Sequence, residues 1–259
     1  MTTWMAEKIW RHDRALVAAG LLAVVALSWA YLWSGAGAME AMGDMLMPMR
    51  TGPWTLSQTI VMLVMWAVMM AAMMLPGAAP MILFYATIAR RRRAAAHQPA
   101  SMSALFAAGY VAVWAAFSVG AVALQFGLNK AALLSPMMEL TSITLAGAVM
   151  IAAGIYQWSP LKRACLRRCS SPLDFVLMHW RDGAGGAFVM GIQHGAYCVG
   201  CCWMLMLLLF VGGVMNLAWI AGLALFVLVE KMFPAGHWMD RGAGLVLMGW
   251  GLVTLMMGL

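Results

Sequence analysis

The sequence predicts an all-α, polytopic integral membrane protein, a single helical bundle of about seven transmembrane helices. Hydrophobic residues make up 64% of the chain and charged residues only 10%, whereas soluble domains are roughly 45–50% apolar and 25% charged. Apolar runs long enough to cross a hydrocarbon core of about 30 Å recur along the chain. The basic residues gather in the short segments between these runs. A soluble domain is therefore not expected.

The apolar runs fall within one domain over 1–259, since no internal repeat at solenoid period divides the chain. We predict spans at about 15–33, 57–89, 103–126, 139–158, 187–211, 217–233 and 242–259. The first run exceeds the roughly 7 to 15 residues of a signal-peptide core. It is therefore expected to remain as an uncleaved first span.

A methionine-rich segment, MEAMGDMLMPM, follows the first span in a loop that also contains Gly and Pro. The chain has 28 Met in all. Thioethers are soft ligands that suit Cu(I). Met39, Met42 and Met45 are therefore candidates to capture a metal ion and hand it over.

The second run is too long to cross a bilayer once without tilt, protrusion or a break. Pro76 and Pro80 predict a break, because each proline removes a helical hydrogen bond and clashes with the preceding turn. Within the run, Met62, Met69 and Met73 share one helical stripe. Such a stripe is more often packing than a ligand ladder, but its place after a Met-rich loop favours a metal route.

The stretch after the fourth span, SPLKRACLRRCSSPLDF, is basic and amphipathic and is expected to lie at the membrane surface. It carries Cys165 and Cys169, which are four residues apart and so share a helix face. Neighbouring Lys and Arg residues lower thiol pKa values. This surface pair is therefore predicted to serve in transient handover.

The fifth span contains GIQHGAYCVGCCWMLMLL. His194, Cys198, Cys201 and Cys202 fall at i, i+4, i+7 and i+8, so they share one helix face. Imidazole and thiolate are the ligands that Cu(I) and Zn(II) prefer. One helix cannot surround an ion, so we expect two or three of these residues to bind together with partners from other helices. The alternative is that the small Cys side chains only pack a helix interface.

The sixth span contains a charge that is costly in lipid, Glu230. It is a candidate to orient His194 or to relay the proton that a thiol releases when it binds metal. The alternative is an interfacial carboxylate that reaches headgroup water. The neighbouring Lys231 is expected to extend to the membrane interface.

The distribution of basic residues predicts the orientation. With seven crossings and a cytoplasmic N-terminus, fourteen of the 16 Lys and Arg residues fall on the cytoplasmic side, and only Arg50 and Lys130 fall outside. This bias follows the positive-inside rule. It also accounts for the net charge of +7 without a nucleic-acid partner.

Three blocks of sequence, MMAAMMLPGAAP, GIYQWSPLKRACLRRCSSP and CVGCCWMLM followed by GGVMNLAWIAGLALFVLVEK, resemble the bacterial family of predicted metal-binding integral membrane proteins. The similarity runs from about residue 57 to 233, and its most specific block is CVGCCW. The resemblance implies an integral membrane location and a suspected metal site at the Cys-rich motif. It implies no established reaction. We expect the membrane to be the bacterial inner membrane.

Three functions fit these features. The first is Cu(I) handling, as a transporter or membrane chaperone, with zinc as the alternative metal. The second is a membrane thiol oxidoreductase that uses the CxxCC motif, and the third is a structural or assembly subunit. No nucleotide-binding motif is present, and an enzyme is the less favoured class. The expected partners are the lipid bilayer, a metal ion and a metallochaperone or membrane protein.

Overall fold

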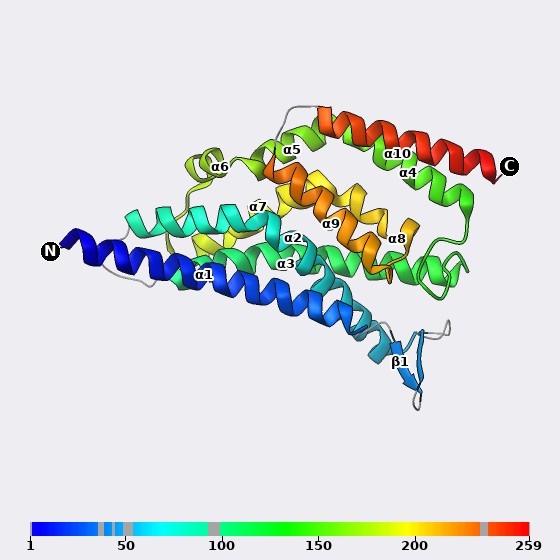
Figure 1. The fold of residues 1–259 in the computed structure, drawn as a ribbon, viewed down its shortest axis with the longest axis horizontal. Coiled ribbons are helices and arrows are strands. Elements are labelled where there is room, and N and C mark those ends of the chain that lie inside the picture. Colours follow the sequence, from blue (N-terminus) through cyan, green and yellow to red (C-terminus); the bar gives the residue numbers. More distant parts are fainter. Residues whose placement is uncertain are drawn as a thin grey trace.

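The computed structural model describes the backbone of residues 2–35, 39–42, 45–48, 54–92, 99–233 and 238–258. It describes side chains over 15–35, 54–90, 101–233 and 238–258. Apart from one short hairpin, the regular elements of these residues are helices (Figure 1). In chain order they are α1 (Thr2–Trp33), β1 (Met39–Met42), β2 (Met45–Pro48), α2 (Leu56–Arg92), α3 (Pro99–Lys130), α4 (Ile143–Gln157), α5 (Pro160–Ser170), α6 (Pro172–His179), α7 (Gly183–Leu207), α8 (Leu209–Gly212), α9 (Leu217–Met232) and α10 (Trp238–Met257).

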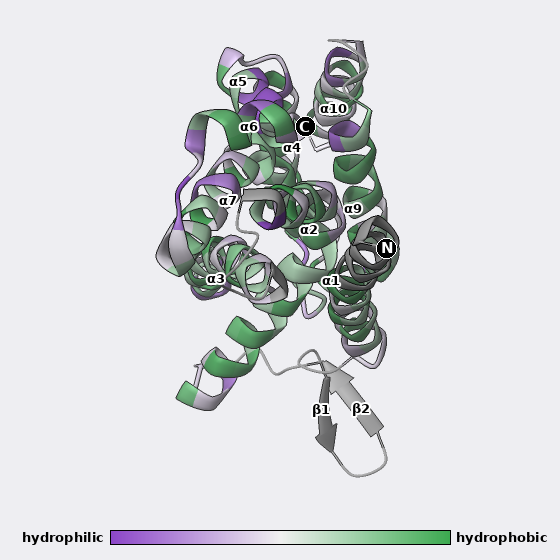
Figure 2. Cartoon of the chain, turned by 90° about the vertical axis from the view of Figure 1, so that its left-hand side faces the viewer, coloured by the Kyte–Doolittle hydropathy of each residue, from purple (hydrophilic) through white to green (hydrophobic). Residues whose placement is uncertain are grey.

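The predicted all-α class is confirmed, and a helix lies within each of the seven ranges expected to span a membrane. That all seven cross a membrane stays a prediction. Within the part of the chain that the structure describes, four segments are long and apolar enough to cross a bilayer, namely Ala15–Trp33, Leu56–Arg90, Ser101–Lys130 and Gly183–Gly212. Helix α4 is apolar but has only 15 residues, or about 22 Å at 1.5 Å per residue. Figure 2 shows hydrophobic residues over most of the helices and a concentration of hydrophilic residues at α5.

Helix α2 corrects one expectation, because it runs unbroken through Pro76 and Pro80. Each proline removes one backbone hydrogen bond, but the rest of the helical ladder remains, and neighbouring helices hold both sides of the lost bond in place. Leu75 and Ala78, which flank Pro76, are buried at 2% and 1% exposure. The two prolines therefore lie within one continuous helix and do not end it.

The methionine-rich segment was expected to be a loop, but its backbone forms a hairpin. Strands β1 and β2 pair antiparallel, with Met39 opposite Pro48 and Met42 opposite Met45. The side chains of Met39, Met42 and Met45 lie outside the described residues. Their predicted part in metal handover therefore stays a prediction.

Glycines bring the central helices into backbone contact. A Cβ atom on Gly191 of α7 would collide with the carbonyl oxygen of Phe106 on α3, and one on Gly109 would collide with the carbonyl oxygen of Phe188. Gly191 and Gly195 form a GxxxG pattern of the kind that packs helices closely in membranes. Because Gly191 faces Phe106 while Gly195 faces Tyr110, α3 and α7 run in the same direction.

Helix α5 packs on α7 through one face. Ser159 caps it by accepting a hydrogen bond from the backbone N–H of Lys162 at 3.0 Å, and Pro160 starts its first turn. The buried residues are Lys162, Leu166 and Cys169, which lie at i, i+4 and i+7 and so share one face. Through this face, Cys169 of α5 is directed toward the Cys-rich part of α7.

Candidate metal centre

Three thiols from two helices meet in the interior of the bundle. The Sγ atoms of Cys169 on α5 and of Cys198 and Cys201 on α7 all lie within 4.8 Å of one another. The three side chains are buried, at 5%, 0% and 1% exposure. This spacing allows one soft metal ion to contact all three sulfur atoms, since thiolates are the ligands that such ions prefer.

The expectation of two separate cysteine sites was wrong for Cys169. That residue was predicted to lie with Cys165 at the membrane surface, but it is buried against Cys198 and Cys201. Cys165 is half-buried, and its Sγ lies 2.7 Å from where a Cβ on Gly200 would stand. Both thiols of α5 therefore face α7, and Cys165 is the more accessible of the two.

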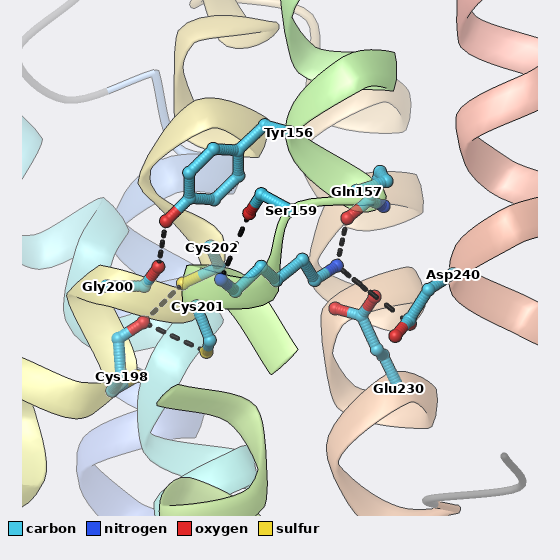
Figure 3. Close-up of polar contacts among 10 residues, drawn as sticks. Tyr156, Gln157, Ser159, Cys198, Gly200, Cys201, Cys202, Glu230 and Asp240 are labelled. Carbon is cyan, nitrogen blue, oxygen red and sulfur yellow. Dashed lines mark hydrogen bonds and ion pairs between the residues drawn. The ribbon is translucent and has the colours of Figure 1, made fainter. Parts of the chain in front are cut away.

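Cys201 and Cys202 both hydrogen-bond back to the α7 backbone. Each thiol donates to the carbonyl oxygen of Cys198 at 3.0 Å (Figure 3). The Sγ of Cys202 also lies 3.9 Å from the Sδ of Met74 on α2. The hydroxyl of Tyr156 on α4 donates to the carbonyl oxygen of Gly200, so α4 also holds this turn of α7.

The sulfur of Cys198 has two polar neighbours from other helices. The Nζ of Lys231 on α9 lies 2.9 Å from it, and the hydroxyl of Tyr110 on α3 lies 3.0 Å from it. Tyr110 also donates to the carbonyl oxygen of Met74 at 3.0 Å. Lys231 was expected at the membrane interface, but it is only 6% exposed. Its ammonium group hydrogen-bonds to the Cys198 sulfur inside the bundle, and this interaction offsets the cost of burying the charge.

His194 lies one turn before Cys198 and is fully buried. Its ring packs among Phe106, Tyr110 and Phe175, at centroid distances of 6.0, 5.6 and 5.3 Å. Neither ring nitrogen has a hydrogen-bond partner. Buried polar groups are rarely left unpaired, so this imidazole has free ligand capacity next to the thiols.

Glu230 does not orient His194, which was one of its two predicted roles, and the other role, as a proton relay, stays a prediction. One carboxylate oxygen pairs with the Nζ of Lys162 on α5, which also donates to the side-chain oxygen of Gln157 on α4. Asp240 on α10 lies 4.0 Å from the same Nζ. Figure 3 shows Gln157, Glu230 and Asp240 converging from three helices. Glu230 thus anchors α5, and no contact links it to His194 among the described residues.

The methionines of α2 chosen from the sequence are buried, and a further one, Met74, contacts a cysteine. Met62, Met69 and Met73 are 1%, 1% and 2% exposed. Met62 contacts Gln125, about 18 Å along α2 from Met74 at 1.5 Å per residue. Met74, which contacts Cys202, is one residue beyond the stripe.

The thiols of α5 have raised pKa values, contrary to the lowering expected from their basic neighbours. Hydrogen bonds that the Cys169 thiol donates toward Cys198 and Cys201, followed by burial, favour the protonated form and raise the pKa of Cys169 well above its ordinary value. Burial, followed by the nearby charge of Cys201, raises the pKa of Cys165, and Arg168 opposes this only in part. Both residues therefore carry their protons at neutral pH until a metal displaces them.

Sequence reasoning missed Cys169, Lys231 and Tyr110 as neighbours of the deep thiols. A signal existed only for Cys169, because Lys162, Leu166 and Cys169 at i, i+4 and i+7 mark the buried face of an amphipathic helix. The other two residues lie on helices that are apolar around their whole circumference. Their neighbours depend on how the helices cross.

Comparison with known protein families gave one match. Residues 63–254 fit the model of a family described as PpoB2, copper chaperone. The matched range contains α3 to α9 and every cysteine of the chain. Comparisons with curated proteins and with solved structures gave no match.

Proposed function

We propose that this chain, which belongs to the PpoB2 copper chaperone family, binds Cu(I) inside a membrane and passes it to a partner. The observation that carries the proposal is the buried cluster of Cys169, Cys198 and Cys201, whose sulfur atoms lie within 4.8 Å of one another. Soft thiolates select Cu(I) and Zn(II) over harder ions. The family description supports copper as the cargo.

In this proposal the three thiolates hold the ion, and His194 is the candidate for a further ligand. The free ring nitrogens of His194 support this assignment. Cys202 and Met74, whose sulfur atoms are 3.9 Å apart, offer a fourth thiol and a thioether as further sulfur ligands beside the cluster. Lys231 places a positive charge 2.9 Å from the Cys198 sulfur, and this charge reduces the net negative charge of a Cu(I)–thiolate centre in a low-dielectric interior.

Copper is favoured over zinc by the methionines. Structural zinc sites use four Cys or His ligands and do not use thioethers, whereas thioethers suit Cu(I). Met62, Met69 and Met73 on α2 are proposed to form a weaker route that leads to the thiols. Met39, Met42 and Met45 are proposed to capture the ion before it enters this route.

The membrane is proposed to be the bacterial inner membrane, crossed seven times with a cytoplasmic N-terminus. Four long apolar helices support membrane insertion, and the positive-inside rule supports the orientation. Helix α5 then lies on the cytoplasmic side. Cys165, half-buried and in contact with Gly200, is proposed to pass copper between the deep thiols and a soluble metallochaperone.

The test is Cu(I) binding by purified protein in mild detergent, in competition with a chromogenic Cu(I) chelator. The triple variant Cys169→Ser/Cys198→Ser/Cys201→Ser is expected to lose the tightly bound equivalent. The matched control is Cys165→Ser, which changes a thiol on the same helix outside the cluster. It is expected to keep the tight equivalent and to exchange copper more slowly with a soluble chaperone.

Two results would contradict the proposal. If the triple variant binds Cu(I) as tightly as the wild type, the cluster is not the copper site. If wild-type protein purifies without copper and with a reducible Cys198–Cys201 disulfide, the thiol oxidoreductase interpretation replaces copper handling.

A further inference from the structure

A second group of sulfur atoms lies away from the cysteines, near the start of α2. The side-chain Nε2 of Gln125 on α3 lies 2.9 Å from the Sδ of Met138 and 3.5 Å from the Sδ of Met62. Two thioethers from different segments therefore converge on one nitrogen atom. All three side chains are buried, at 1% for Gln125 and Met62 and 8% for Met138.

The orientation of the Gln125 amide follows from its third neighbour. The indole N–H of Trp66 lies 2.6 Å from the Oε1 of Gln125, and an indole N–H only donates. The amide oxygen must therefore face Trp66, so the NH2 group faces the sulfurs. Trp66 is itself fully buried and packs on Phe210 at 5.4 Å between ring centroids. The amide is thus held in one orientation.

A buried amide whose donors meet only thioethers is poorly satisfied, because sulfur is a weak acceptor. Burial of a polar group without strong partners costs free energy. Neither packing nor helix formation requires this arrangement. The arrangement of the Gln125 amide between two thioethers is what a soft-cation site would need, because such a cation could replace the amide N–H groups as the partner of both sulfur atoms.

The backbone at Met138 is also held in an uncommon conformation. Its φ is +57°, in the left-handed region that residues other than glycine seldom adopt. Two backbone bonds hold the residue, one from its N–H to the Ser135 carbonyl at 2.9 Å and one to its carbonyl from Val214 at 3.4 Å. The adjacent Leu140 N–H bonds to the Phe210 carbonyl at 2.8 Å. The loop between α3 and α4 therefore places the Met138 side chain in the interior.

We propose that Met62 and Met138, with Gln125 as the group that holds them ready, form a second and weaker Cu(I) site. This inference rests on the proposed function, since it supplies a place where copper waits before it reaches the thiols. Thioethers are neutral and bind without releasing a proton, whereas thiols must lose one. The second site should therefore bind Cu(I) more weakly than the cysteines and without dependence on pH.

The experiment counts Cu(I) bound by four purified proteins under anaerobic, reducing conditions. They are the wild type, the Cys169→Ser/Cys198→Ser/Cys201→Ser variant, that variant with Met62→Leu/Met138→Leu, and that variant with Met81→Leu/Met150→Leu. Leucine keeps most of the apolar volume and removes the sulfur. Met81 and Met150 are matched controls, buried at 1% and 3%.

The triple cysteine variant is expected to bind one weak equivalent of Cu(I), with an affinity unchanged between pH 6 and 8. The Met62→Leu/Met138→Leu change should abolish it, and the control pair should keep it. If the pair at Met62 and Met138 impairs folding, the single change Met138→Leu, which lies outside the helices, gives the same comparison.

Each outcome separates the two sites. If the triple cysteine variant binds no Cu(I), or if the Met62→Leu/Met138→Leu protein binds as much as its control, the second site does not exist and the thiol site stands. If the triple cysteine variant keeps all the copper of the wild type and loses it only when Met62 and Met138 are also changed, the thiol site fails and the methionine site stands.

Discussion

A thiol binds Cu(I) only after it has lost its proton, and this requirement governs the chemistry of the cluster. Cys169 shares the site with two further thiols, and their hydrogen bonds, together with burial, keep its pKa well above the ordinary value. Binding of copper therefore releases protons at neutral pH. The metal and the protons compete for the same sulfur atoms.

The first prediction concerns the pH dependence of Cu(I) binding by these thiols. Lowering the pH favours the protonated thiols, so the apparent Cu(I) affinity of the wild type should fall, by about tenfold per pH unit for each proton released. The measurement is competition with a Cu(I) chelator at pH 6, 7 and 8. The Cys169→Ser variant should show a shallower dependence, since it releases one proton fewer. An affinity that is constant over this range would mean that the thiols do not hold the ion.

Among the elements, α5 decides whether the site is complete, because it supplies Cys169. The helix is attached to the bundle by the buried pair of Lys162 and Glu230, at 0% and 2% exposure. Gln157 and Asp240 also face the Lys162 ammonium. A buried ion pair gives little net stability, but removing one partner leaves an uncompensated charge. Replacing either Lys162 or Glu230 alone should therefore lower the stability of the protein more than replacing both together.

The second prediction tests this anchor. Glu230→Ala should destabilise the protein by roughly 3–5 kcal/mol, the usual cost of breaking a buried pair, and should make Cys169 more reactive toward a maleimide. The measurements are thermal unfolding in detergent and the rate of labelling. The control is Glu139→Ala, at an exposed position, with an expected change within about 0.5 kcal/mol. The double variant Lys162→Met/Glu230→Leu should recover stability; if it does not, the pair is not what holds α5.

For the bundle as a unit, the helix directions constrain how the chain can cross a membrane. Helices α3 and α7 run in the same direction, so the chain must return between them. In the proposed membrane arrangement, α4 makes that return, although at about 22 Å it is shorter than a hydrocarbon core of about 30 Å.

The third prediction concerns topology. Seven crossings with a cytoplasmic N-terminus place the two ends of the chain on opposite sides of the membrane. Reporter fusions that are active on only one side should give opposite results at the N- and C-terminal ends. A cysteine-accessibility scan should find the loop between α3 and α4 outside and α5 inside. Equal reporter results at both ends would show that α4 returns to the side from which it enters.

The sequence by itself determined the all-helical class, the apolar character of the long helices and the common face of His194, Cys198 and Cys201. These features depend on composition and on the 3.6-residue period, both of which act between residues close in the chain. The amphipathic character of α5 was visible in the same way. The local pattern did not reveal which helix the buried face of α5 packs against.

Only the tertiary structure decided that Cys169 completes the thiol cluster, that Lys231 lies beside Cys198, and that Met74 contacts Cys202. The central helices are apolar on all sides, so hydrophobic periodicity does not mark which face contacts which neighbouring helix. The crossing of the helices is set by close approaches such as Gly109 with Phe188 and Gly191 with Phe106. Such contacts join residues some eighty positions apart, and for that reason they determine the metal site while leaving no local signal in the sequence.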